Sequence, residues 1–207
     1  VQIPGSDGVF LATQKFYSPN DGQDAKIVIV SPDKAGDWNV RVLVELPFVH
    51  RFDILNSNGK QYLIACTIKS AHEYKDDWRT PGKIWAAELP EDLSVYNQEH
   101  QLEIKCLKDG LLKNHGYCKI NEDGEESAAI ATESGVFQVI PPHNGNDWQV
   151  LLLTKDPASD VAFGDFDKDG QTEMLVITPF HGDTVKIYKK SIDSYRCIFT
   201  YDFPMEF

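Results

Sequence analysis

A short pattern occurs twice in this chain and limits what it can fold into. Residues 37–40 (Asp-Trp-Asn-Val) precede Pro47 and His50, and residues 147–150 (Asp-Trp-Gln-Val) precede Pro157 and Asp160. In both copies the proline stands nine residues after the tryptophan, and a polar residue stands twelve after it. Helical periodicity is almost absent, and short β-branched and aromatic runs alternate with Gly, Pro, Asn and Asp turns. These features predict an all-β protein built from repeats.

The apolar runs group into four units of up to four strands. The first unit lacks its first strand and has expected strands at 9–16, 26–31 and 38–46. The second unit has strands at 49–55, 61–68, 83–89 and 102–107, and the third at 115–120, 127–132, 136–140 and 148–154. The fourth has strands at 160–166, 173–178, 184–189 and 195–201. Four-stranded units repeated every roughly 45–65 residues are typical of β-propellers. We therefore expect residues 1–207 to form one propeller segment with antiparallel blades at about 9–46, 48–108, 113–155 and 158–202.

The number of blades predicts that this segment is part of a larger ring. A closed propeller has about four to eight blades, whereas the first unit here is incomplete. Residues 203–207 resemble the start of a further first strand. We expect another chain or a further segment to complete the ring, because open sheet edges invite pairing.

The net charge of −12 argues against nucleic acid and anionic membrane surfaces as partners. No apolar run approaches the roughly 18–20 residues that a membrane span needs, and no signal peptide is recognisable. The four cysteines lie in strand-like runs without a C-x-x-C pair, which predicts buried, reduced thiols and slightly favours the cytoplasm. The chain begins with Val1 rather than Met, so secretion stays open as an alternative.

An acidic loop lies between two expected strands of the last unit. Residues 163–170 read Phe-Gly-Asp-Phe-Asp-Lys-Asp-Gly, which places carboxylates at alternating positions before a glycine that permits a sharp turn. Strands rather than helices flank the loop, and position 12 is Val176 rather than Glu, so it is not an EF-hand. The expected ligands of a structural Ca²⁺ are Asp165, Asp167, Asp169 and Glu173. A metal-free acidic turn is the alternative.

This segment resembles the repeat of FG-GAP/VCBS-type β-propellers. The resemblance covers roughly residues 9–202 and is strongest at 147–190. It implies a ring-shaped scaffold with a ligand site at one mouth of the central channel. The corresponding turns at 56–59 and 121–124 keep the final glycine but lose acidic ligands, so we expect tight turns without a cation there.

Residues that open the first strand of successive blades are expected to meet at the channel mouth. The repeat aligns His50 with Asp160, alignment of residues 200–202 with 154–156 adds Glu206, and His115 opens the first strand of the third unit. Converging imidazoles and carboxylates could hold a divalent transition metal or act as acid and base. The alternative is that these side chains only face the water in the channel.

A long insertion at residues 70–82 is expected on the same face. Loops of this length are usually functional or disordered, and its aromatic residues argue against disorder. Its candidate ligand-binding side chains are His72, Glu73, Tyr74, Lys75, Trp78 and Arg79, with His181 in the matching turn of the last unit. Aromatic faces beside charged groups suit a sugar or another polar ring. The alternative is a surface loop that packs Trp78 on the next blade.

Two functions follow from the resemblance. The histidine-rich mouth looks most like carbohydrate-active propellers, namely the aldos-2-ulose dehydratase group and the propeller polysaccharide lyases. By that likeness the protein is a metal-assisted lyase or dehydratase acting on a sugar or keto-sugar. His50 and His115 would then be bases or metal ligands, and His72 or Tyr74 a proton donor. Substrate contacts would come from Lys75, Glu73, Trp78, Arg79, Asp160, His181 and Glu206. The alternative is a non-catalytic, calcium-stabilised propeller that binds a ligand or protein, or a subunit that completes another chain's ring.

Overall fold

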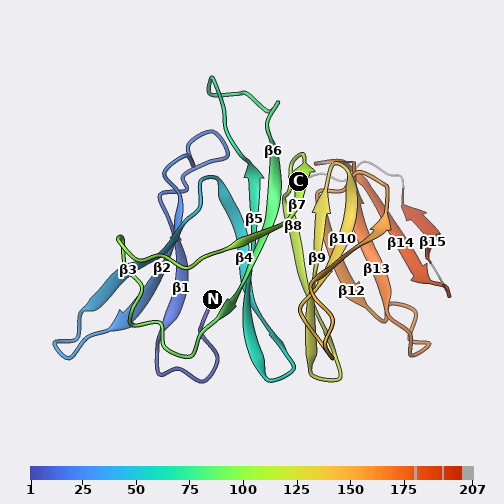
Figure 1. The fold of residues 1–207 in the computed structure, drawn as a ribbon. Helices are drawn as coiled ribbons and strands as arrows, with labels where there is room; N and C mark the ends of the chain where they lie inside the picture. The colour runs from blue at the N-terminus through green and yellow to red at the C-terminus, as the bar shows by residue number, and fades with distance from the viewer. Residues whose placement is uncertain (180, 193, 202–207) are drawn as a thin grey trace. The chain divides into compact units, whose positions relative to one another are not determined.

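The computed structural model describes residues 1–179, 181–192 and 194–201. Within these residues the chain forms fifteen β-strands and no helix, arranged as four antiparallel sheets (Figure 1). The all-β class predicted from the sequence is therefore confirmed. In the described part of the chain no helix is long and apolar enough to cross a membrane. The chain divides into two compact units, Val1–Gly110 and Leu111–Phe207.

The first unit contains two sheets in which strands adjacent in sequence are also adjacent in space (Figure 1). All neighbours are antiparallel and follow one another along the chain, so each sheet is a simple meander. One sheet has three strands, β1 (Phe10–Gln14), β2 (Lys26–Pro32) and β3 (Trp38–Glu45). The other has β4 (Val49–Ser57), β5 (Lys60–Lys69), β6 (Pro81–Leu89) and β7 (Lys105–Leu111). The three-stranded first sheet matches the unit predicted to lack a strand.

Apolar side chains of both sheets form the core of this unit. Ile27, Leu43, Ile54 and Leu63 are at most 1% exposed and belong to one cluster. Full burial of such a side chain is worth about 1.5–3 kcal/mol, so the cluster is a main source of stability.

The last strand of the second sheet begins later than the sequence predicts. We expected a strand at 102–107, but β7 begins at Lys105. Leu102 is buried in the core cluster and donates its N–H to the carbonyl of Leu43 on β3, at 2.8 Å. Arg41 also donates to the carbonyls of Leu93, Ser94 and Tyr96 in the preceding segment. The chain before β7 therefore bonds to β3, and its apolar residues fill the core without belonging to a strand.

The second unit contains two four-stranded meanders (Figure 1). The first has β8 (Gly116–Glu122), β9 (Glu125–Thr132), β10 (Gly135–Ile140) and β11 (Gln149–Thr154). The second has β12 (Asp160–Gly164), β13 (Glu173–Thr178), β14 (Thr184–Lys190) and β15 (Tyr195–Tyr201). The first strand of this second sheet, β12, contacts β8 and β9.

Small residues allow the two sheets of the second unit to approach closely. Ala128, Ala129 and Ala131 on β9 have no exposed surface, and Ala129 and Ala131 pack in a cluster with Val161 and Met174 from the other sheet. Alanine adds little bulk above the sheet, so the neighbouring strand can lie close to the backbone.

The tight turns predicted at 56–59 and 121–124 are confirmed. Asn58 and Gly59 have φ of 50° and 72°, and Asp123 and Gly124 have φ of 54° and 88°. In each hairpin the two residues lie between paired strand ends. Positive φ at both positions defines a type I′ turn, which Asn-Gly and Asp-Gly favour.

The prediction that the cysteines are buried is right for only one of them. Cys66 on β5 is buried, Cys118 is partly buried, and Cys106 and Cys197 are exposed. The exposed pair lie on β7 and β15, the last strands of their sheets. A last strand has a neighbour on one side only, so apolar-looking runs there stay in contact with solvent.

Candidate functional site

Three carboxylates of the acidic loop lie close enough to share one ion. Each of Asp165, Asp167 and Glu173 offers an oxygen within 4.8 Å of the others. Gly164 pairs with Glu173 across β12 and β13, so the hairpin brings the two ends of the loop together. Asp165 and Asp167 are exposed, whereas Glu173 is completely buried. Carboxylate oxygens are the ligands that Ca²⁺ and Mg²⁺ prefer.

Backbone N–H groups hold the first two carboxylates in place. Asp165 accepts from the N–H of Asp169 at 3.1 Å and from that of Gly170 at 3.0 Å. Asp167 also accepts from the N–H of Asp169, at 3.1 Å. Gly170 has a φ of 86°, which a side chain would strain, so the predicted role of this glycine is confirmed. The loop therefore folds back onto its own carboxylates.

One oxygen of Glu173 has no hydrogen-bond partner. Its Oε2 accepts the N–H of Phe166 at 2.9 Å, but Oε1 is buried without a hydrogen bond among the described residues. Its nearest opposite charge is the ammonium of Lys189, 3.3 Å away. A buried carboxylate oxygen is costly without a cation nearby, and among the described residues the Lys189 ammonium is the cation that faces it.

Lys189 is the internal counterion of this cluster. Its Nζ lies 3.0 Å from Asp167 and also contacts Asp169 and Glu173. The hydrogen bond to Asp169 and then that to Asp167 raise the pKa of Lys189. Asp169, expected to be a ligand, bonds to Lys189 and Gln171 instead of joining the triad.

A second cluster brings together His115 and Asp160, which the sequence predicted at the channel mouth, with His181, which it predicted in a turn on the same face. A cavity of about 320 Å³ in the second unit, here the histidine cavity, is lined by His115, Ser159, Asp160, Ile177, His181 and Gly182. The rings of His115 and His181 are 5.3 Å apart and nearly perpendicular, at 74°. The structure therefore places His181 from the turn after β13 beside His115, as the sequence predicted for one face.

The strand ends fix the position of His115. Its backbone N–H donates to Ala131, and its Nδ1 lies 3.1 Å from the carbonyl oxygen of Ser159. A carbonyl only accepts, so this bond places a proton on Nδ1. Nε2 of neutral His115 is then the basic nitrogen, as a general base or a metal ligand requires.

Two other residues expected at the channel mouth, His50 and Glu206, lie outside the described part of the second unit. His50 lies on β4 of the first unit, where its ring packs 5.2 Å from that of Phe16. Glu206 lies outside the described residues.

The insertion at 70–82 folds around a residue that the sequence analysis did not single out. Asp77 is 1% exposed and accepts from the backbone N–H groups of Glu73 and Arg79, each at 3.0 Å. The Arg79 guanidinium donates two further hydrogen bonds to the Asp77 carboxylate, both at 2.8 Å. The Arg79 side chain, followed by the backbone N–H of Glu73, holds the pKa of Asp77 well below its usual range.

Charged residues predicted to bind substrate bond to each other here. Arg79 pairs with Glu73 at 2.6 Å as well as with Asp77, and its guanidinium lies 5.6 Å from the ring centre of Tyr74. The ring of His72 packs on Phe48, with centroids 5.3 Å apart. Lys75 is exposed. The loop is thus ordered by its own charges.

A buried lysine anchors the loop to the sheet. Lys69, at the end of β5, has no exposed surface, and burial lowers its pKa. Its Nζ donates to Asn20 at 2.9 Å and to the carbonyl of Asp77 at 3.1 Å. It also lies 4.5 Å from the ring centre of Trp78, a cation–π contact. Trp78 therefore packs against its own sheet.

Replacing Asp77 by Asn should open this loop. Asparagine has one side-chain carbonyl, so it cannot accept all four bonds. We expect trypsin to cleave after Arg79 about tenfold faster in Asp77→Asn, as lost hydrogen bonds to a charged group imply. Glu73→Gln is the control, because its side chain is 78% exposed and its carboxylate bonds to Arg79 without replacing any bond of Asp77. Equal cleavage of wild type and Asp77→Asn would contradict this role.

Comparison with models of known protein families and with curated proteins found no match for this chain. The candidate sites therefore depend on their own geometry and chemistry.

Proposed function

We propose that the chain is a segment of an FG-GAP/VCBS-type β-propeller, in which the four sheets are blades and the acidic loop holds a structural calcium ion. Three observations support the ring. Each sheet is a meander of three or four strands, the first sheet lacks one strand, and the first strands β8 and β12 of successive sheets are in contact. Innermost strands of adjacent propeller blades lie next to each other in this way.

We propose a ligand-binding rather than a purely catalytic role for this segment. The observation that carries the calcium assignment is the buried Oε1 of Glu173, which faces the Lys189 ammonium at 3.3 Å without a hydrogen bond and lies within reach of two further carboxylates. A divalent cation there would neutralise the cluster and fix the loop. The ordered 70–82 loop, with Arg79 engaged by Asp77 and Glu73, supports a scaffold.

Calcium titration tests this assignment. We expect the wild type to bind one Ca²⁺ with a Kd of about 10⁻⁴ M, in the range of calcium-dependent extracellular modules. At about 100 times Kd, calcium should stabilise the fold by about 2.7 kcal/mol. Glu173→Gln should weaken binding about tenfold or more, because one carboxylate of a small ligand set is lost.

Asp183→Asn is the matched control. It removes one exposed carboxylate from the same unit but outside the loop, so calcium affinity should stay within about twofold, as screening of distant surface charges implies. No calcium binding to the wild type, or equal binding to Glu173→Gln, would reject the site. Isothermal titration calorimetry and thermal melting give independent measurements.

A carbohydrate lyase or dehydratase is the second candidate, and the histidine cavity favours it. His115, His181 and Asp160 offer a base and an acid around a space of about 320 Å³. An elimination needs a base for the C–H proton and a cation to stabilise the enolate, so a divalent metal held by imidazoles there would suit it. Loss of turnover of a uronic-acid glycan in His115→Gln, with normal calcium binding, would favour the enzyme. The partner of such an enzyme would be an oligosaccharide.

A further inference from the structure

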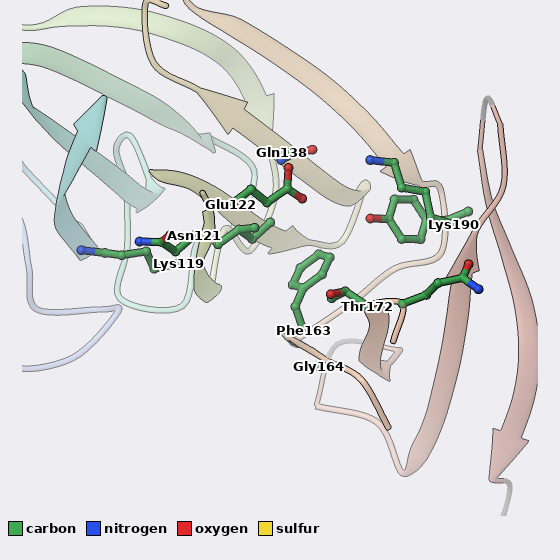
Figure 2. Close-up of a pocket in the computed structure, with 11 residues that line it drawn as sticks. Lys119, Asn121, Glu122, Gln138, Phe163, Gly164, Thr172 and Lys190 are labelled. Carbon is green, nitrogen blue, oxygen red and sulfur yellow. The ribbon is translucent and has the colours of Figure 1, made fainter. Parts of the chain in front are cut away.

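A second cavity lies in the same unit, away from the histidine cavity. It encloses about 490 Å³ between the hairpin end of β8 and the acidic-loop end of β12 (Figure 2). None of the residues that line one cavity lines the other. Its volume falls in the range of small-molecule sites, which is about 300–1,000 Å³.

Two aromatic rings form the apolar part of this cavity. Phe163 on β12 and Tyr195 on β15 pack edge to face, with centroids 6.5 Å apart and planes at 82°. Figure 2 shows the Phe163 ring projecting into the space between Glu122 and Thr172. Burial raises the pKa of Tyr195, so its phenol stays protonated and can donate a hydrogen bond. Such rings offer flat apolar surfaces with a polar tip.

Three side-chain amides form much of the polar part, and each is oriented by a second bond. Asn121 accepts the N–H of Gly124 at 3.2 Å, and Gln138 donates to the hydroxyl of Ser127 at 3.0 Å. Gln171 donates to Asp169 at 3.1 Å. Because these bonds use one group of each amide, other donors and acceptors of the same amides remain for a ligand.

The charges around the cavity balance. Glu122 contributes a carboxylate, and Lys190 an ammonium from the opposite sheet (Figure 2). Lys119 is partly neutralised by Glu126 at 3.6 Å. A cavity without a strong net charge selects against highly charged ligands. The cavity therefore combines side-chain amides with the Glu122 carboxylate, which accepts hydrogen bonds, and the Lys190 ammonium, which donates them. This combination suits ligand groups that both donate and accept hydrogen bonds.

We propose that this cavity binds a neutral pyranose unit of a glycan. The hydroxyls of such a ring both donate and accept, which suits the amides, the Glu122 carboxylate and the Lys190 ammonium, and its axial C–H face suits Phe163 and Tyr195. The volume accommodates more than one ring. This site uses none of the triad carboxylates and none of the residues that line the histidine cavity, so it goes beyond the function proposed above.

Titration of the full chain with three neutral probes tests the proposal. Cellotriose, maltotriose and triacetylchitotriose are added separately to ¹⁵N-labelled protein, with calcium and again with EDTA. At least one probe should give saturable shifts at residues 120–122 and 163–164 in both buffers. Tyr195→Ala should weaken that binding about tenfold or more, because an aromatic face is lost.

Three variants make the result unambiguous. Glu122→Ala replaces an exposed side chain, so we expect the variant to fold. It should weaken sugar binding about tenfold, because a hydrogen bond to a charged group is lost. His181→Ala alters only the histidine cavity and should leave the affinity unchanged. Gln138→Leu should act like Tyr195→Ala.

Several outcomes would overturn the proposal. These are no saturable binding of any of the three probes, binding lost in His181→Ala but kept in Glu122→Ala, or tight binding of triglycine in place of the sugars. The last would assign the cavity to a zwitterionic peptide. Failure of calcium to bind the acidic loop would leave this result untouched, so the two proposals fail separately.

Discussion

Lys189→Met should raise the affinity of the acidic loop for calcium about tenfold, because it removes an ammonium that competes for the same carboxylates. Lys189 contacts Asp167, Asp169 and Glu173, two of which belong to the triad. A divalent cation that enters the triad must displace this ammonium or bind beside it against repulsion. Methionine keeps much of the length of the side chain but carries no charge.

The same substitution should lower stability when no calcium is present. Without the ammonium the carboxylates face each other with no opposite charge, and the buried Oε1 of Glu173 loses its nearest cation. We therefore expect Lys189→Met to melt below the wild type in EDTA and to gain more from calcium. Calorimetric titration gives the affinity, and thermal melts in the two buffers give the stability.

Lys190→Met separates direct contact from general charge. Lys190 is the next residue on β14, so its loss changes the net charge equally but leaves the contacts of Lys189 in place. This control should change calcium affinity by about twofold at most, as screening of exposed charges implies. A Lys189→Met variant that binds calcium more weakly than the wild type would contradict competition. It would mean instead that the ammonium positions the carboxylates.

The strands could be predicted well because each depends on local sequence. β-Branched and aromatic runs bounded by Asn-Gly and Asp-Gly turns determine where a hairpin folds, without reference to distant residues. The start of β7 could not be predicted in this way. Leu102 has the composition of a strand residue, but its N–H bonds to Leu43, about sixty residues earlier in the chain.

The residues of the candidate sites also differ in whether local sequence alone predicts them. The D-x-D-x-D-G motif marks Asp165 and Asp167 because both candidate ligands lie within one short loop. Lys189 comes from another strand, yet a signal for it existed. An antiparallel pairing that begins at Thr178 and Thr184 places Lys189 opposite Glu173, as the structure has it. Following the strand register along the expected hairpin would have found this counterion.

The charged loop shows where sequence reasoning stops. Glu73, Asp77 and Arg79 have the composition of a substrate site, and composition alone does not tell whether charges face a ligand or each other. The deciding fact is the burial of Asp77, which depends on the anchor formed by Lys69 and Trp78. That anchor joins the loop to the end of a neighbouring strand, and nothing in the loop's own sequence specifies it.

Gly116→Ala should destabilise the second unit by about 3 kcal/mol, at the upper end of the cost of overpacking a core. A Cβ at Gly116 would lie 2.6 Å from the Cα of Asp160, 2.7 Å from the carbonyl oxygen of Ser159 and 2.8 Å from the Cβ of Ala131. Two of these atoms belong to the backbone and cannot rotate away, so β8 and β12 must separate. The hydrogen bond between His115 and Ser159, at 3.1 Å, would then be lost.

We expect the melting temperature of Gly116→Ala to fall by about 10 °C or more, given the size of the unit. Gly124→Ala is the control in the same sheet. Its Cβ would meet no atom within 4 Å, so it costs only the strain of a positive φ, about 1 kcal/mol. Equal melting of the two variants would mean that β8 and β12 do not approach so closely. The proposed propeller arrangement would then lose the close packing of first strands that supports it.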